Sequence, residues 1–232
     1  MFRFKQFTIR QDQTAMKVCT DACVLGAVAD VAGKSILDIG TGTGLLALMA
    51  TQRNPTARVD AIEIDKLAFE QAVENVAESP FADRIRLWHG PVQGYQSAKP
   101  YDRILTNPPF FVNSLRSPDA AANRAHHADD LSFADLIAAV VRLLVPGGQW
   151  WVLLPPFEMG QLTTLAAEAG LHQSARLLLR HHAQKPVFRV VAGFCREPVV
   201  AVSEQMLTIY ELDGRTFTPA FRTLLQPFYL IF

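Results

Sequence analysis

Short runs of apolar, often β-branched residues alternate with stretches of helical periodicity between residues 33 and 154. The expected strands cover residues 35–39, 58–64, 84–88, 101–106 and 149–154. The clearest helix follows Asp65, a residue suited to cap a helix, and its apolar stripe has the i, i+3, i+4, i+7, i+8 spacing of one packed face: Phe69, Ala72, Val73, Val76 and Ala77. Strands that alternate with helices predict βαβ units and a parallel sheet with helices on both faces.

The pattern changes after Gly170. Two further expected strands, residues 175–182 and 187–195, flank the turn residues Gln184, Lys185 and Pro186, which predicts an antiparallel hairpin at the end of the sheet. The sequence therefore predicts an α/β fold with a mostly parallel seven-stranded sheet. We expect an N-terminal segment at residues 1–32, the main domain at 33–198, and an aromatic-rich C-terminal extension at 199–232 that packs on the same domain.

Composition excludes several classes of protein. Half of the 232 residues are hydrophobic and 19% are charged, which is incompatible with an intrinsically disordered chain. No apolar stretch is long enough to span a membrane, and the first ten residues contain no apolar run typical of a signal sequence. Three cysteines are too few for a disulfide framework, so we expect a cytoplasmic protein with reduced thiols. Basic and acidic residues balance at 22 each, so a nucleic acid would have to bind a local basic patch.

A glycine-rich run stands where the first expected strand of the main domain leads into a helix: Asp38-Ile39-Gly40-Thr41-Gly42-Thr43-Gly44. Glycine at such a turn lets the backbone approach a ligand closely. Gly42, Gly44 and Ala47 also satisfy the G-x-G-x-x-A spacing of dinucleotide sites, so the pattern alone leaves that cofactor open. The carboxylate of Asp38 favours a cationic ligand over a pyrophosphate. The D-x-G-x-G-x-G run resembles the first motif of class I S-adenosylmethionine-dependent methyltransferases, whose cofactor carries an ammonium and a sulfonium, and this resemblance assigns the aspartate and the three glycines to cofactor binding.

Two further segments complete the expected cofactor site. Glu63, with Ile64 beside it, ends the second strand about 20 residues after the glycine run, where an acid accepts ribose hydroxyls in both classes of cofactor. The N-terminal segment contains Lys17, followed by Thr20 and Asp21, either of which can cap a helix. In methyltransferases with this order of motifs such a segment folds over the methionine end of the cofactor, and the resemblance places these three residues there.

A second motif, Asn107-Pro108-Pro109-Phe110, follows the fourth strand, at the edge where open α/β sheets bind ligands. It resembles the [D/N/S]-P-P-[Y/F] motif of methyltransferases that modify planar exocyclic nitrogens. Such a nitrogen is a poor nucleophile because its lone pair is delocalised into the ring. The Asn107 side-chain oxygen and the Pro108 carbonyl can each accept one N–H group and stabilise the positive charge that grows during attack. Pro109 stiffens the turn, and Phe110 offers a ring on which the base can stack.

Positive charge is concentrated late in the chain. Residues 172–196 contain five cations and no acid, and four of these are candidate RNA contacts: Arg176, Arg180, Lys185 and Arg189. The stretch after Phe110 has no clear period and adds Arg116 and Arg124 to the same candidate set. The histidine pairs 126–127 and 181–182 lack partners at metal-ligand spacing, so we expect no metal.

Together these motifs resemble those of a bacterial family, the tRNA adenine-N6 methyltransferases that act beside the anticodon of a valine tRNA. The most specific part is N-terminal: Phe4-Lys5-Gln6-Phe7 and Ala15-Met16-Lys17-Val18, with Thr20-Asp21. The resemblance implies a Rossmann-like class I fold and methyl transfer from S-adenosylmethionine to N6 of an adenine in tRNA, at position 37 of the anticodon loop. The family commonly has Tyr where this chain has Phe110, a change that keeps the ring and loses the hydroxyl.

Two other functions share part of this pattern. A protein glutamine N5-methyltransferase uses a similar Asn-Pro-Pro-Tyr motif, but such enzymes carry a substantial helical domain before the glycine loop, where this chain has only residues 1–33. A non-catalytic nucleotide- or RNA-binding relative predicts a damaged acceptor pair, whereas Asn107 and Pro108 are both present. The sequence therefore favours a tRNA methyltransferase that has no membrane or metal partner.

Overall fold

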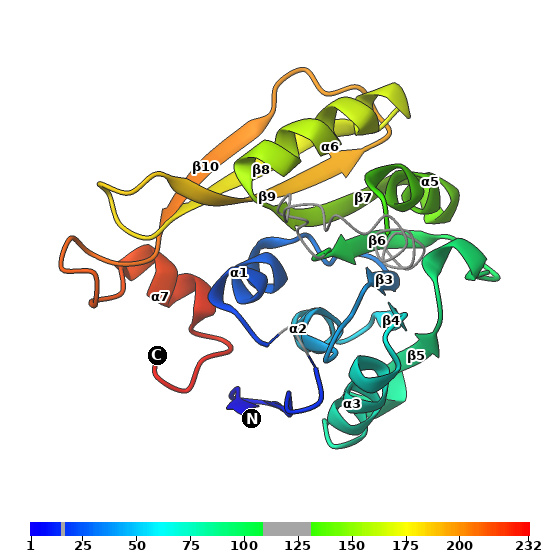
Figure 1. The fold of residues 1–232 in the computed structure, drawn as a ribbon, viewed down its shortest axis with the longest axis horizontal. Helices are drawn as coiled ribbons and strands as arrows, with labels where there is room; N and C mark the ends of the chain where they lie inside the picture. The colour runs from blue at the N-terminus through cyan, green and yellow to red at the C-terminus, as the bar shows by residue number, and fades with distance from the viewer. Residues whose placement is uncertain (15–16, 109–130) are drawn as a thin grey trace, which may run out of the picture.

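An eight-stranded sheet forms the centre of the molecule (Figure 1). The computed structural model describes residues 1–14, 17–108 and 131–232 of the chain. In the order in which they lie side by side, the strands are β10 (Ser203–Thr208), β8 (His172–Arg180), β9 (Val187–Cys195), β7 (Leu144–Leu154), β6 (Tyr101–Thr106), β3 (Ser35–Ile39), β4 (Arg58–Glu63) and β5 (Ile85–His89). Two short strands, β1 (Phe2–Arg3) and β2 (Thr8–Ile9), pair separately.

Helices cover both faces of the sheet (Figure 1). One face carries α1 (Thr20–Val28), α2 (Leu45–Arg53), α3 (Lys66–Ala77) and α7 (Pro219–Leu225), and the other carries α5 (Phe133–Leu143) and α6 (Pro156–Glu168). Short 3-10 turns span Ala82–Arg84 and Val92–Gly94. Successive strand residues enter opposite cores, because side chains alternate across a strand: Ile36 packs beneath α2 and Leu37 packs beneath α5, both fully buried.

The directions of the strands confirm the predicted α/β fold. β3, β4, β5, β6 and β7 run parallel to one another, as βαβ connections require. β9 runs antiparallel to both β7 and β8, so β8 and β9 form the predicted terminal hairpin. In a sheet of this kind the ligand site is expected at the carboxyl ends of the parallel strands, where the glycine run and Asn107 both lie.

The predicted number of seven strands is wrong, because the C-terminal segment adds an eighth. β10 pairs in parallel with the edge strand β8, with Ser203 opposite Ala175 and Thr208 opposite Arg180. The sequence Ser-Glu-Gln-Met-Leu-Thr has no apolar alternation, and only Leu207 of it is buried. An edge strand of this composition is held mainly by backbone hydrogen bonds to its neighbour. Because these bonds do not require apolar side chains, the strand has no hydrophobic pattern by which it could be predicted.

The two ends of the chain lie side by side on one side of the molecule (Figure 1). Lys5 Nζ donates hydrogen bonds to the carbonyls of Gln226 and Phe232, at 2.6 and 2.8 Å. Helix α1 is buried along most of its length and packs on α2 and α7. Residues 1–32 thus include a buried helix, whose N-terminal end lies beside the glycine run. In the described parts of the chain no helix has both the length and the apolar character needed to cross a membrane.

Candidate functional site

The glycine run turns the chain from β3 into α2. Gly40, Gly42 and Gly44 have φ angles of +71°, +57° and +87°, a left-handed conformation that glycine adopts without a steric penalty. The N–H groups of Gly40 and Thr41 both donate to the carbonyl of Ile62 on β4, at 2.9 Å. A Cβ atom built on Gly40 or Gly42 meets no described atom within 4 Å. The loop therefore presents bare backbone to open space, as close contact with a ligand requires.

Asp38 lies beneath this loop. Its carboxylate is fully buried, and Oδ2 accepts hydrogen bonds from Thr41 Oγ1 at 2.5 Å and from the Ala47 N–H at 3.1 Å. The other oxygen, Oδ1, is buried with no hydrogen-bond partner among the described residues. Burial raises the pKa of Asp38 to about 7, against the two hydrogen bonds, which lower it. Asp38 does not line the described cavity, so its main contact is with the loop that faces the ligand.

The Glu63 carboxylate forms hydrogen bonds both with the glycine run and with the residue that caps α3. Its Oε2 accepts the Gly42 N–H at 2.7 Å, and its Oε1 accepts the Asp65 N–H at 2.9 Å. The residue is 8% exposed, and each oxygen keeps a second lone pair that can accept a ligand hydroxyl. Ile64, beside it, is 46% exposed, and it does not line the described cavity.

A small cavity brings the N-terminal segment, the glycine run and the Asn-Pro-Pro-Phe motif together. Of the predicted site residues, Lys17, Gly40, Gly42 and Asn107 line it. Its other lining residues are Val18, Cys19, Ala22, Thr41, Thr43, Leu45 and Leu46. The described walls enclose about 50 Å³. Residues 15–16 and 109–130, which adjoin two of these walls in the sequence, lie outside the described part, so the predicted positions Pro109, Phe110, Arg116 and Arg124 have no place in this geometry.

Asn107 has the most distinctive chemistry in this cavity. Its side-chain oxygen Oδ1 is buried and finds no hydrogen-bond partner in the described parts of the chain. An unpaired buried acceptor costs about 1–3 kcal/mol, a cost that a bound donor removes. The residue directly follows β6, and Pro108 after it is buried and has no N–H group to compete for this oxygen. The cavity can therefore accept an N–H group at a fixed point facing the glycine run.

Two buried amides of α3 hold the site together, and the sequence analysis did not single them out. Asn75 Nδ2 donates to the Thr43 carbonyl of the glycine run and to the Arg10 carbonyl, both at 2.9 Å. Gln71 Oε1 accepts two backbone N–H groups of the N-terminal segment at 3.1 Å each. Both residues are 1% exposed. The signal that could have identified them is the spacing of two amides, four residues apart, on the buried face of an amphipathic helix.

Two residues predicted for different roles pair with each other. Arg189 Nε donates to Asp21 Oδ2 at 2.8 Å, and the two side chains are 25% and 10% exposed. The pair links β9 to the first turn of α1, directly after the lining residues Lys17 and Cys19. Asp21 therefore orients the N-terminal segment through an ion pair, and neither Asp21 nor Thr20 lines the described cavity.

The remaining predicted RNA contacts lie on the outer edge of the sheet. Arg176 on β8 forms an ion pair with Glu204 on β10. Arg180 donates to the hydroxyl of Thr208 at 2.8 Å. Lys185, in the turn between β8 and β9, is exposed. These cations are separated from Asn107 by β9 and β7 in the sheet order.

The Asp21–Arg189 ion pair leads to a prediction for stability. We expect Asp21→Ala to lower the free energy of unfolding by about 3 kcal/mol, because breaking a largely buried pair leaves a desolvated charge. Urea unfolding of Asp21→Ala, Arg189→Ala and the double variant measures the coupling, which should exceed about 1 kcal/mol. Effects of the two single variants that simply add would show that the pair contributes nothing to stability.

The described residues contain no group of three His, Cys, Asp or Glu side chains that could hold a metal ion. Burial and the neighbouring Asp21 carboxylate raise the pKa of the Cys19 thiol to about 12, so Cys19 lines the cavity as a neutral thiol. The polar groups of the described lining include the backbone of the glycine run, the Lys17 amine and the Asn107 amide. The Glu63 carboxylate is not part of this lining, but it contacts the glycine run through the Gly42 N–H.

Comparisons with known proteins agree with this geometry. The methyltransferase small domain family matches residues 22–173. A Dyadobacter fermentans protein named tRNA1(Val) (adenine(37)-N6)-methyltransferase is 53% identical over 234 residues, which cover 100% of this chain and 98% of that protein.

Solved structures show the same fold at low identity. An Agrobacterium tumefaciens protein described as a predicted O-methyltransferase superposes with a TM-score of 0.67 at 20% identity, over 89% of this chain and 96% of that one. The glycopeptide N-methyltransferase MtfA, complexed with S-adenosyl-L-methionine, superposes with a TM-score of 0.57 at 14% identity, over 82% and 100% of the two chains. These likenesses establish the class I methyltransferase fold. With the full-length match at 53% identity, they show that the chain belongs to the tRNA1(Val) (adenine(37)-N6)-methyltransferase family.

Proposed function

We propose that this protein transfers the methyl group of S-adenosylmethionine to the exocyclic N6 of adenine 37 in tRNA1(Val). The observation that carries the proposal is the buried Oδ1 of Asn107, which has no hydrogen-bond partner among the described residues and lies in the same cavity as the open glycine run. The chain is also 53% identical to a relative with that name. A tRNA modified in its anticodon loop implies a cytoplasmic site of action. An unpaired loop adenine needs little unstacking before it enters a pocket.

The residues present fit the cofactor. The open backbone at Gly40 and Gly42 offers close approach, and the free lone pairs of Glu63 suit ribose hydroxyls. Lys17, which lines the same cavity shortly before α1, suits the carboxylate of the methionine moiety. When bound, S-adenosylmethionine would supply an electrophilic methyl group on a sulfonium, whose methyl–sulfur bond would break so that S-adenosylhomocysteine leaves.

Asn107 and Pro108 prepare the adenine amine for attack. Each N–H of the amine is directed to one acceptor, the Asn107 side-chain oxygen or the Pro108 carbonyl, which draws the nitrogen toward tetrahedral geometry. The same acceptors stabilise the positive charge that appears on the nitrogen as the new N–C bond forms, and a pre-oriented acceptor does this without reorganisation. The methylated ammonium is acidic enough to lose its proton to water, so no separate base is needed. Stacking of the base on Phe110 belongs to the same proposal.

The predicted RNA contacts have unequal support. Lys185 is exposed, and the side chains of Arg176 and Arg180 are partly engaged by Glu204 and Thr208, so all three can reach a phosphate only at the outer edge of the sheet. Arg189 is more fully engaged by Asp21 and fits a structural role better.

Methylation of defined transcripts tests this proposal. With methyl-labelled S-adenosylmethionine, we expect a tRNA1(Val) transcript to yield labelled N6-methyladenosine after digestion to nucleosides. A transcript with guanosine at position 37 should stay unlabelled, which is the matched control. Label at another nucleoside, or label in a glutamine of an added protein substrate, would contradict the proposal.

A further inference from the structure

A second cavity opens at the end of the sheet opposite the glycine run. It measures about 660 Å³ and is formed where β3, β4, β5 and β6 begin, together with the loop before β6. Its charged lining residues are five cations and one acid: Lys34, Arg58, Arg84, Arg86, Lys99 and Asp60. We call this cavity the basic cleft. The lining carries a net charge of about +4, although the whole chain is neutral.

Three of the five cations have their charged groups available. Lys34, Arg86 and Lys99 are exposed, and no ion pair or hydrogen bond to another described residue engages their side-chain nitrogens. Arg84 instead donates to two backbone carbonyls, at 3.0 and 3.1 Å, and Arg58 donates to one at 3.3 Å. The available cations come from three separate segments of the chain that meet in the lining of this cleft.

The acid of the cleft is held by tyrosine hydroxyls. Asp60 Oδ2 accepts hydrogen bonds from Tyr101 at 2.6 Å and from Tyr95 at 3.4 Å, and the two hydroxyls lie 2.6 Å apart. Arg142 on α5 donates to the carbonyls of Tyr95 and Val92, at 2.6 and 2.9 Å, and so fixes the loop that carries Lys99. The only carboxylate in the lining is thus occupied within a fixed hydrogen-bond network and competes weakly for the cations.

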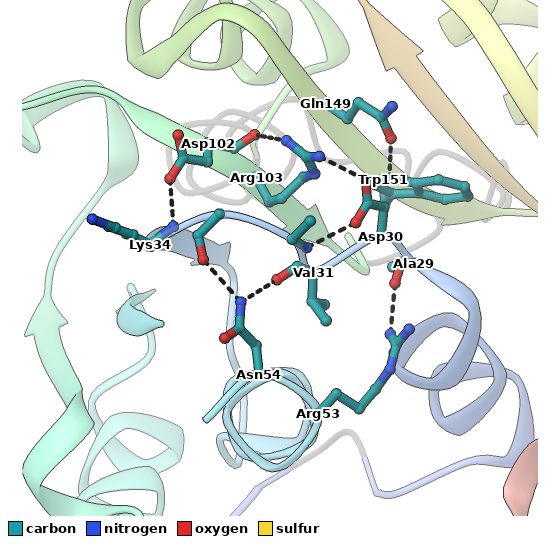
Figure 2. A network of polar contacts seen from close by, with 12 residues as sticks. Ala29, Asp30, Val31, Lys34, Arg53, Asn54, Asp102, Arg103, Gln149 and Trp151 are labelled. Atoms are coloured by element: carbon teal, nitrogen blue, oxygen red, sulfur yellow. Dashed lines mark hydrogen bonds and ion pairs between the residues drawn. The ribbon is translucent and has the colours of Figure 1, made fainter. Parts of the chain in front are cut away.

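A second network of hydrogen bonds holds the backbone at Lys34 (Figure 2). The backbone N–H of Lys34 donates to Asp102 Oδ2 at 2.7 Å, and Asn54 Nδ2 donates to the Val31 carbonyl at 2.7 Å. The side chain of Lys34 points away from this network, so its ammonium is not used by Asp102 (Figure 2). A hydrogen-bonded frame with exposed ammonium and guanidinium groups has the chemistry of a phosphate-binding surface.

We infer that the basic cleft binds backbone phosphates of the tRNA, at a contact separate from the methylated loop. This inference rests on the proposed function. The cleft and Asn107 lie at opposite ends of strands of five or six residues, which separates them by roughly 20 Å. An RNA substrate of many nucleotides can span that length. Exposed cations around an open cleft contact phosphates without reading bases, so they add affinity and orientation but no sequence preference.

Removal of two available charges tests the inference. In Arg86→Gln/Lys99→Gln we expect the Kd for tRNA to rise about tenfold near physiological salt, and the slope of log Kd against log salt to become shallower by about two. The KM for tRNA should rise with it, while kcat and the Kd for S-adenosylmethionine stay unchanged, because the cleft touches neither the adenine nor the cofactor.

A charge-matched control is Arg3→Gln/Arg215→Gln, which removes two exposed cations elsewhere on the chain. Equal tRNA affinity in the cleft variant and this control would overturn the inference. An unchanged Kd for S-adenosylmethionine also shows that the variant is folded, and Lys34→Gln/Lys99→Gln provides a second variant should the first one misfold. Filter binding of tRNA needs no turnover, so failure of methylation in the wild-type protein would contradict the proposed function without deciding the role of the cleft.

The cations of the basic cleft have the chemistry to bind the phosphates of a small molecule as well as those of RNA. Calorimetric titration with ATP and with inorganic pyrophosphate distinguishes the two sources. We expect no saturable binding of either below the millimolar range. Saturable binding that is lost in Arg86→Gln/Lys99→Gln, with tRNA affinity unchanged, would assign the cleft to a small ligand and overturn its assignment to RNA.

Discussion

Asn107→Ala should reduce single-turnover methylation of tRNA1(Val) by about 10²–10³-fold. The variant removes the oxygen that is buried and unpaired in the described structure, and with it the acceptor that stabilises charge on the attacking nitrogen. Binding of S-adenosylmethionine should be nearly unchanged, because the glycine run and Glu63 are intact. The measurements are a quenched time course with enzyme in excess and calorimetric titration of the cofactor.

Asn107→Asp is the informative companion to this variant. It keeps an oxygen at the same position and should retain more activity than Asn107→Ala, because the N–H groups of the amine still find an acceptor. Turnover of Asn107→Ala equal to that of the wild type would remove Asn107 from the mechanism. A parallel loss of cofactor affinity would show that the residue binds the cofactor instead of activating the amine.

Asp38→Ala should weaken the binding of S-adenosylmethionine by at least about tenfold and lower the free energy of unfolding by about 2–4 kcal/mol. The substitution leaves the Thr41 hydroxyl and the Ala47 N–H without their acceptor beneath the glycine run. The backbone of the run then loses the support that holds it against the cofactor. Calorimetry and urea unfolding measure the two effects separately.

Asp38→Asn tests whether cofactor affinity depends on the hydrogen bonds of Asp38 or on its negative charge. Because the carboxylate lies beneath the loop and does not line the described cavity, the amide, which keeps one acceptor oxygen, should retain most of the cofactor affinity. A loss in Asp38→Asn as large as in Asp38→Ala would show that the negative charge itself attracts the cofactor.

The wild type and Asp38→Asn also test a prediction about the dependence of stability on pH. Burial raises the pKa of Asp38 to about 7, so in the folded protein the carboxyl keeps its proton between about pH 4 and 7, where the unfolded chain has lost it. The part of the stability that this retained proton provides is therefore complete below about pH 4 and is lost as the pH rises to about 7. Unfolding free energies of the wild type should fall over this range relative to those of Asp38→Asn. A constant difference would show that Asp38 titrates normally.

Local features of the site followed from the sequence because each depends on residues close together in the chain. Three glycines in five residues after a buried strand predict a tight turn, and the structure forms it with positive φ angles at Gly40, Gly42 and Gly44. Asn107 lies at the carboxyl end of β6 because a short apolar strand stops where two prolines begin. The βαβ order fixes the direction of each parallel strand, so both motifs come to the same edge of the sheet.

Pairings between distant segments could not be predicted in this way. The sequence suggested Asp21 for the cofactor and Arg189 for RNA, whereas the fold joins them across 168 positions. Strand β10 is polar and becomes a strand because β8 leaves an open edge beside it. The buried amides Asn75 and Gln71 acquire their roles only once α3 lies against the N-terminal segment.

The sequence by itself determined the alternation of strands and helices from β3 to β9, the glycine turn after β3 and the place of Asn107 at the end of β6, because short-range spacing sets backbone conformation. Only the tertiary structure decided which charges meet. The cations of the basic cleft are spread from Lys34 to Lys99, on both sides of the acid-rich residues 60–83. They gather because parallel strands start at a common edge, where side chains far apart in the chain share one surface.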